Sequence, residues 1–214
     1  MDDSSLLGGQ RASRRLSGQA SQQLAVGLSL LAVACAVGSA SGYASGWTRY
    51  HSESFSWPEL HRESPITLDI RQGWWESRTT WGITRFAPTL FKIDGQVVRP
   101  FGALAAGALV VSIVCSIWAL FVSSAVLLDL HYSRQPTVKA MRRMALITSL
   151  MLYAAVITLY AALAISLRHQ TKQQLEVAVV PRPDWACGLG ILAGITWTLL
   201  TAVYSDMGPP DSHV

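Results

Sequence analysis

The residue types that carry catalysis or bind metals are few in this chain and lie far apart. The five histidines and three cysteines form no i, i+4 histidine pair and no Cys/His cluster of the kind that holds zinc. The sequence also has no Gly-x-Ser-x-Gly elbow, no phosphate loop and no dinucleotide fingerprint. We therefore expect no enzyme, no metal and no cofactor, and bound lipid is the one small molecule that we expect.

One short motif in the N-terminal region resembles a phosphorylation site. Arg14-Arg15-Leu16-Ser17 matches the Arg-Arg-x-Ser preference of basophilic kinases, which makes Ser17 a candidate phosphosite. A phosphate there would add nearly two negative charges beside the membrane and weaken attraction to anionic lipid. The alternative is a chance match in a basic tail, since motifs this short match often.

A second short motif lies at the C-terminus, Asp211-Ser212-His213-Val214. A PDZ domain binds such a peptide as an added strand and holds its carboxylate in backbone N–H groups. Ser212 supplies the hydroxyl that these domains read and Val214 the apolar terminal side chain. The alternative is a free, flexible chain end, which is the usual state of a terminus.

The elements that would position such groups are membrane spans. Only 14% of the residues are charged, against about 25% in an ordinary soluble domain. A helix needs about 20 apolar residues to cross the hydrocarbon core. Four stretches without a charged residue are long enough, at about 24–46, 101–128, 144–167 and 185–205. The low charge and the four long apolar stretches together exclude a soluble enzyme, a nucleic-acid-binding domain and a disordered chain.

The sequence therefore predicts a mostly α fold, an integral, multi-pass bundle of four transmembrane helices. It divides into a polar N-terminal tail (1–23), a transmembrane domain (24–205) that includes an outer loop (47–100), and a C-terminal tail (206–214). Three arginines precede the first span and only Arg49 follows it closely, which predicts that both termini are cytoplasmic or on the matrix side.

The first outer loop holds five of the eight tryptophans and carries strand signals. Side chains alternate from Trp75 through Trp81, and Asp94-Gly95 is a hairpin turn signal between two short apolar runs, the second at residues 96–98. We expect a small antiparallel β-sheet that packs Trp75 and Trp81 onto the outer helix ends. The alternative is that the tryptophans lie only in the headgroup belt.

Small residues recur four apart on three of the spans, a spacing that lets membrane helices approach closely. We expect these residues to pack the bundle internally, and the alternative is contact with another chain. The spans contain no ionisable residue, so we expect no transporter, pump or selective channel. The small residues are Gly38, Gly42, Gly46, Ala103, Gly107, Gly190 and Gly194.

Four spans with a long, tryptophan-rich first outer loop resemble the claudin-like tetraspan proteins. The stretch from Thr79 to Arg85, with Trp81-Gly82 at its centre, is similar to the first-loop motif of amastins, the trypanosomatid relatives of claudins. Both groups place a cysteine pair in this loop, and this chain has Ser77 and Ala87 at the amastin positions. The resemblance implies a left-handed four-helix bundle capped by an outer sheet. It also implies a role in adhesion, membrane organisation or assembly.

Two functions follow, and both are non-enzymatic. The first is a structural or adhesion protein whose outer loop and helix faces bind lipids and other membrane proteins, as a homo- or hetero-oligomer without nucleic acid. The second is an accessory subunit of a mitochondrial respiratory or other large membrane complex. The chain has no asparagine for N-glycosylation and no cysteine in its loops, which fits an internal membrane. The plasma membrane and the mitochondrial inner membrane both remain open.

Overall fold

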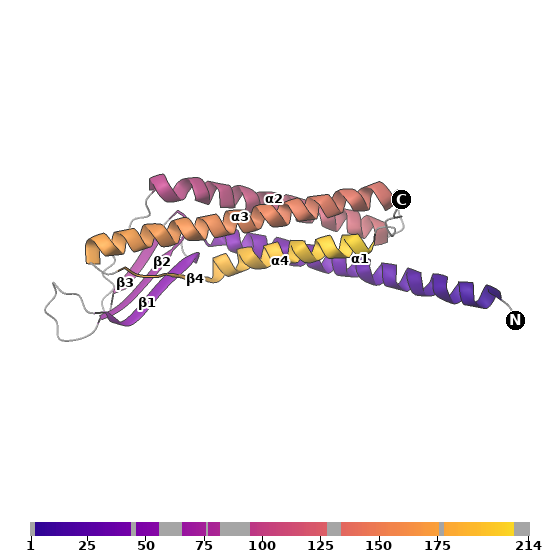
Figure 1. The fold of residues 1–214 in the computed structure, drawn as a ribbon, viewed down its shortest axis with the longest axis horizontal. Coiled ribbons are helices and arrows are strands. Elements are labelled where there is room, and N and C mark those ends of the chain that lie inside the picture. Colours follow the sequence, from indigo (N-terminus) through magenta and orange to yellow (C-terminus); the bar gives the residue numbers. More distant parts are fainter. Residues whose placement is uncertain are drawn as a thin grey trace.

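The computed structural model is mostly helical, with a small antiparallel sheet at one end (Figure 1). It describes residues 3–43, 46–55, 66–75, 77–81, 95–127, 134–175 and 178–207. In chain order the elements are α1 (Asp3–Ser41), β1 (Thr48–Phe55), β2 (Ile66–Gln72), β3 (Ser77–Trp81), α2 (Gly95–Leu127), α3 (Arg134–Leu175), β4 (Arg182–Pro183) and α4 (Trp185–Asp206). The predicted fold class is confirmed.

The four helices pack as a ring in which α1 and α3 each contact both α2 and α4. Successive helices run in opposite directions, so the start of α1 and the end of α4 lie at the end of the bundle opposite the sheet (Figure 1). This places both chain ends on one side of the membrane. Which compartment that side faces stays a prediction.

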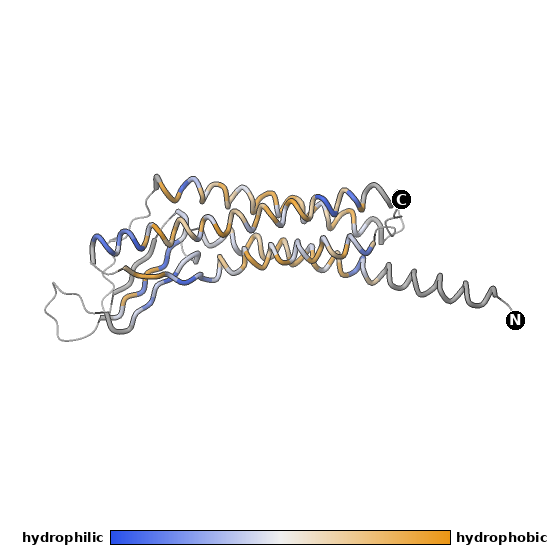
Figure 2. Tube along the Cα trace, viewed as in Figure 1, coloured by the Kyte–Doolittle hydropathy of each residue, from blue (hydrophilic) through white to orange (hydrophobic). Residues whose placement is uncertain are grey.

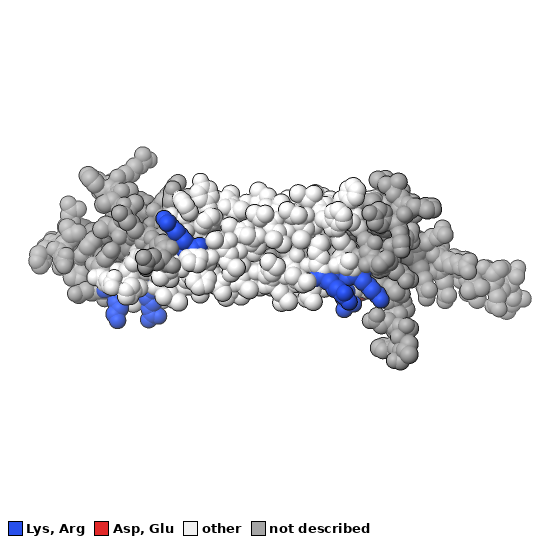
Figure 3. All heavy atoms as spheres, turned by 90° about the horizontal axis from the view of Figure 1, so that it is seen from above, with Lys and Arg blue, Asp and Glu red and all other residues white. Residues whose placement is uncertain are grey.

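Each helix contains a stretch apolar enough to cross a membrane, and the chain is a multi-pass membrane protein. Between 33% and 50% of each apolar stretch is buried inside the bundle, so at least half of each stretch faces outward. Figure 2 shows hydrophobic residues along the middle of the helices, and Figure 3 shows Lys and Arg at the two ends of a white band. The stretches are Ala20–Ser41, Val97–Ser124, Val138–Gln173 and Trp185–Asp206.

Hydrogen bonds made by side chains tie α4 to the other three helices. Trp197 Nε1 donates to Ser112 Oγ of α2 at 2.9 Å across the diagonal of the ring. Ser39 Oγ of α1 donates to the Ala186 carbonyl at 2.8 Å. Ser149 of α3 makes a 2.8 Å hydroxyl contact with Thr198. Such bonds add to van der Waals packing where lipid removes the hydrophobic driving force.

The sheet has the strand order β3-β2-β1-β4, and every neighbouring pair is antiparallel. Strands β1 to β3 come from the first outer loop, where a sheet is predicted, but strands are predicted only in the second half of the loop, and the sequence does not indicate β1 or β2. The two-residue β4 comes from the second outer loop and pairs with the start of β1 through Thr48 and Arg49. The sequence did not indicate β4, and its pairing makes the two outer loops one unit.

Two parts of the sheet prediction are wrong. Gly95 begins α2, and residues 96–98 are helical instead of forming the second strand of a hairpin. Val98 is fully buried in the helical core, and that tertiary packing outweighs a local turn signal. Trp75 lies in a bend before β3 and is 55% exposed, so it does not share a strand with Trp81.

Candidate functional site

The junction between sheet and bundle is closely packed around aromatic rings. Trp47 is fully buried, and the ring of Trp74 lies on Gly102 of α2, where an added Cβ would be 2.9 Å from Trp74 Cε3. Gly46 has a φ of +130°, a backbone conformation that favours glycine. A side chain at this position would collide with the indole of Trp185. Tryptophan is thus a structural residue here.

Backbone hydrogen bonds fix this junction. The Trp47 N–H donates to the Gln72 carbonyl at 3.0 Å, and the Trp47 carbonyl accepts from the Asp184 N–H at 3.1 Å. The Ala186 N–H of α4 donates to the Gly46 carbonyl at 2.8 Å. The sheet is therefore held directly against the ends of α1 and α4.

The two faces of the sheet have opposite character because side chains alternate along each strand. Leu68 and Ile70 of β2 are fully buried and pack with Leu167 of α3 and Val179. Asp69 and Arg71 of β2 alternate with these residues and lie on the opposite, outer face. Their register partners in β1, His51 and Arg49, lie on the same outer face.

One carboxylate is shared by the basic side chains of this outer face. Asp69 Oδ1 is 3.0 Å from Arg49 Nε and 3.9 Å from His51 Nδ1, while Asp69 Oδ2 is 3.2 Å from Arg71 Nε. The hydrogen bond from Arg49 to Asp69, and the charge of Asp69, raise the pKa of Arg49 above its ordinary value. The Arg49 guanidinium is therefore always charged.

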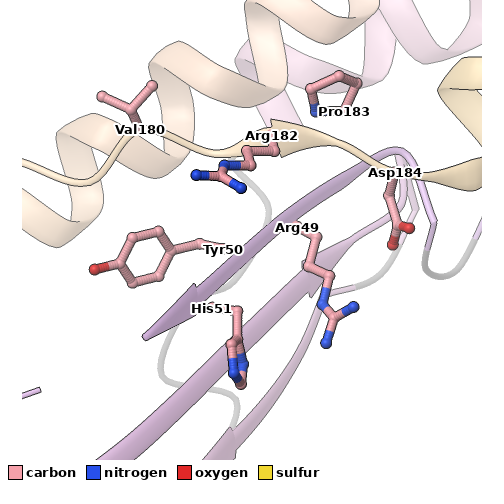
Figure 4. Close-up of a pocket in the computed structure, with 7 residues that line it drawn as sticks. All are labelled: Arg49, Tyr50, His51, Val180, Arg182, Pro183 and Asp184. Atoms are coloured by element: carbon pink, nitrogen blue, oxygen red, sulfur yellow. The ribbon is translucent and has the colours of Figure 1, made fainter. Parts of the chain in front are cut away.

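A groove of about 500 Å³ lies between β1 and the segment that leads into α4 (Figure 4). Asp184 lines one end and caps α4, because its Oδ1 accepts from the Trp185 N–H at 2.8 Å. The groove holds basic, aromatic and apolar groups together, a combination suited to binding an anion that carries an apolar part. Its lining residues are Arg49, Tyr50, His51, Val180, Arg182, Pro183 and Asp184.

Most of the predicted helix-packing residues lie inside the bundle. An added Cβ on Gly38 would be 2.7 Å from Leu189 Cδ1, and one on Gly42 would overlap Ala186 Cβ, so both face α4. Gly46 meets Trp185, Gly190 meets Val156 and Gly194 meets Tyr153.

Ala103 and Gly107 of α2 behave differently. Both are exposed on the outside of the bundle, and an added Cβ on Gly107 would have nothing within 4 Å.

Several predicted residues lie outside what the structure describes. Trp81 is opposite Leu68 in the β2–β3 register, but its side chain is not described. Ser17 belongs to α1, again without a described side chain. The other residues outside the described part are Gly82, Arg85, Asp94, Ser212 and Val214.

The basic outer face of the sheet escaped the sequence analysis. Its signal is the alternation in β2, where buried Leu68 and Ile70 flank Asp69 and precede Arg71. Within the part of the chain that the structure describes, no three His, Cys, Asp or Glu residues could hold a metal ion. Comparison with models of known protein families and with curated proteins finds no match.

Proposed function

We propose that this chain is a non-enzymatic structural membrane protein that associates with other membrane proteins. The association uses the outer side of α2, and the outer sheet presents a second surface away from the spans. This is an adhesion or assembly role, in which the bundle is a scaffold and no reaction is catalysed.

The observation that carries the proposal is the unpartnered small-residue face of α2. Gly38 and Gly42 of α1 and Gly190 and Gly194 of α4 are covered by neighbouring helices, whereas Gly107 has open space where its side chain would be. Ala103 lies one turn away, and Val110 and Val114 beside them are 59% and 61% exposed. Small residues flanked by β-branched ones allow a second helix to approach closely.

Two buried hydroxyls are satisfied within their own helices, which fits a scaffold. The Ser116 hydroxyl donates to the Ser112 carbonyl of its own helix at 2.7 Å, and Ser29 donates to Ala25 in the same way.

The test compares three exposed glycines, of which only Gly107 has a small residue one turn before it. Gly107→Leu is made beside Gly188→Leu and Gly27→Leu, because those two glycines are also exposed with nothing within 4 Å but lack a small residue one turn before. Each variant is purified in mild detergent and its mass is measured by native mass spectrometry. We expect wild-type assemblies to be lost only in Gly107→Leu.

A wild-type chain that is monomeric in membranes and in detergent would refute the proposal. Co-purification of a stoichiometric set of respiratory subunits would instead favour the accessory-subunit alternative. The resemblance to claudin-like proteins and amastins stays a prediction.

A further inference from the structure

The sheet aligns arginines across all four of its strands. In the register Arg49 of β1 is opposite both Arg182 of β4 and Arg71 of β2, and Arg71 is opposite Arg78 of β3. We call these four residues the arginine row. Like charges directly opposite each other destabilise a sheet, so such a row needs a counter-charge.

The side chains that the structure describes supply part of that counter-charge. Asp69 lies in the adjacent row, and both Arg49 and Arg71 share it. Asp184 lies at the end of the groove, with one oxygen used as the cap of α4. Among residues with described side chains, the row contains Arg49, Arg71 and Arg182 and these are the two carboxylates beside it, so three arginines face two acids.

Two members of the row lie close along the chain to tryptophans. Arg49 follows Trp47 by two residues, and Arg182 precedes Trp185 by three. At about 3.3 Å per strand residue, the Cα atoms of these arginines are within about 10 Å of the Cα atoms of the tryptophans. Trp75 and Trp185 are 55% and 47% exposed, which is typical of tryptophan at the headgroup level.

The groove brings two members of the row together with apolar surface. Arg49 and Arg182 line it from neighbouring strands, and Val180, which is 72% exposed, forms part of its wall (Figure 4). A guanidinium group binds phosphate oxygens through two parallel N–H bonds. An amphiphile with a phosphate at its polar end would contact the arginines with its phosphate and the apolar surface with its apolar part.

We propose that this groove binds the headgroup of an anionic phospholipid from the leaflet on the sheet side. Arg49 and Arg182 donate to the phosphate, and Arg71 adds positive charge from the next strand. A lipid fits better than a soluble phosphate because the groove adjoins the tryptophans of the interface and exposes Val180 to the ligand.

The experiment uses the full chain in nanodiscs of phosphatidylcholine, with or without phosphatidylglycerol, and counts retained lipids by native mass spectrometry. Arg49→Gln with Arg182→Gln should lower retention of phosphatidylglycerol about tenfold, the loss expected for one charge-assisted hydrogen bond. The matched control is Arg168→Gln with Lys172→Gln. These two exposed cations lie near the end of α3, at the end of the bundle that carries the sheet. The control should retain lipid like the wild type.

A second variant avoids the paired strands. Val180→Asp places a carboxylate in the groove at an exposed position outside the sheet, and Val180→Asn is its neutral control. Only the aspartate should lower retention. Equal retention in all variants would overturn the proposal. Displacement of phosphatidylglycerol by millimolar inorganic phosphate would also overturn it, because the site would then be one for soluble phosphate.

Discussion

The hydrogen bond from Trp197 to Ser112 offers a sharp test of the bundle, because it joins helices on the diagonal of the ring. Both residues are fully buried, and the indole Nε1 lies 2.9 Å from the serine Oγ. Ser112→Ala removes the acceptor and leaves the indole N–H unpaired inside the protein. Trp197→Phe removes the donor and also leaves space where the second ring was.

The expected magnitudes follow from that geometry. A buried donor without a partner costs about 1–3 kcal/mol, but side-chain hydrogen bonds between membrane helices average about 0.6 and reach about 1.7 kcal/mol. We expect Ser112→Ala to lower the free energy of unfolding by about 1 kcal/mol. Trp197→Phe should cost more because it adds a cavity. The double variant should cost about 1 kcal/mol less than the sum of the two single variants.

The free energies are measured by denaturation in mixed detergent micelles, followed by circular dichroism. Ser116→Ala is the matched control, since Ser116 is as buried as Ser112 on the same helix but donates to its own backbone. Paired with Trp197→Phe, it should be additive. A coupling energy for Ser112 and Trp197 below about 0.3 kcal/mol, the scatter of additive pairs, would refute the predicted contact.

Three further predictions concern the ends of the bundle. Gly42→Leu should abolish the folded state seen by size-exclusion chromatography because its side chain would overlap Ala186, whereas Gly27→Leu should elute like the wild type. Trp74→Ala should lower thermal stability by about 3 kcal/mol, as aromatic truncations in a packed site do, and Trp75→Ala should change it by less than about 1 kcal/mol. Asp184→Ala should cost about 1 kcal/mol through loss of the α4 cap, while Asp184→Asn, which keeps an acceptor oxygen, should cost less; chemical denaturation separates the two.

The number, order and approximate extent of the spans could be predicted from the sequence. Crossing a bilayer requires about 20 apolar residues whatever their partners are, so the signal lies in each segment by itself. The outer sheet could be predicted only in part. Strand alternation favoured β-structure in the first loop, but the turn signal at Asp94-Gly95 indicated a strand where Val98 packs as helix.

The arginine row depends on information that no single segment contains. Arg49, Arg71, Arg78 and Arg182 are scattered over more than half of the sequence, and neighbouring residues give none of them a special role. The pairing of β1, β2 and β3 aligns the first three, and β4, which the sequence did not indicate, adds Arg182 by pairing with β1.

The same division holds for the small residues of the helices. Their four-residue spacing is readable in the sequence and predicts close approach of some helix. Only the packing of α1 and α3 against α4 decides that Gly38, Gly42 and Gly194 are covered while Gly107 is open. Spacing is a property of one helix, but burial is a property of its neighbours, so the sequence determined the spans and the tertiary structure determined the surfaces.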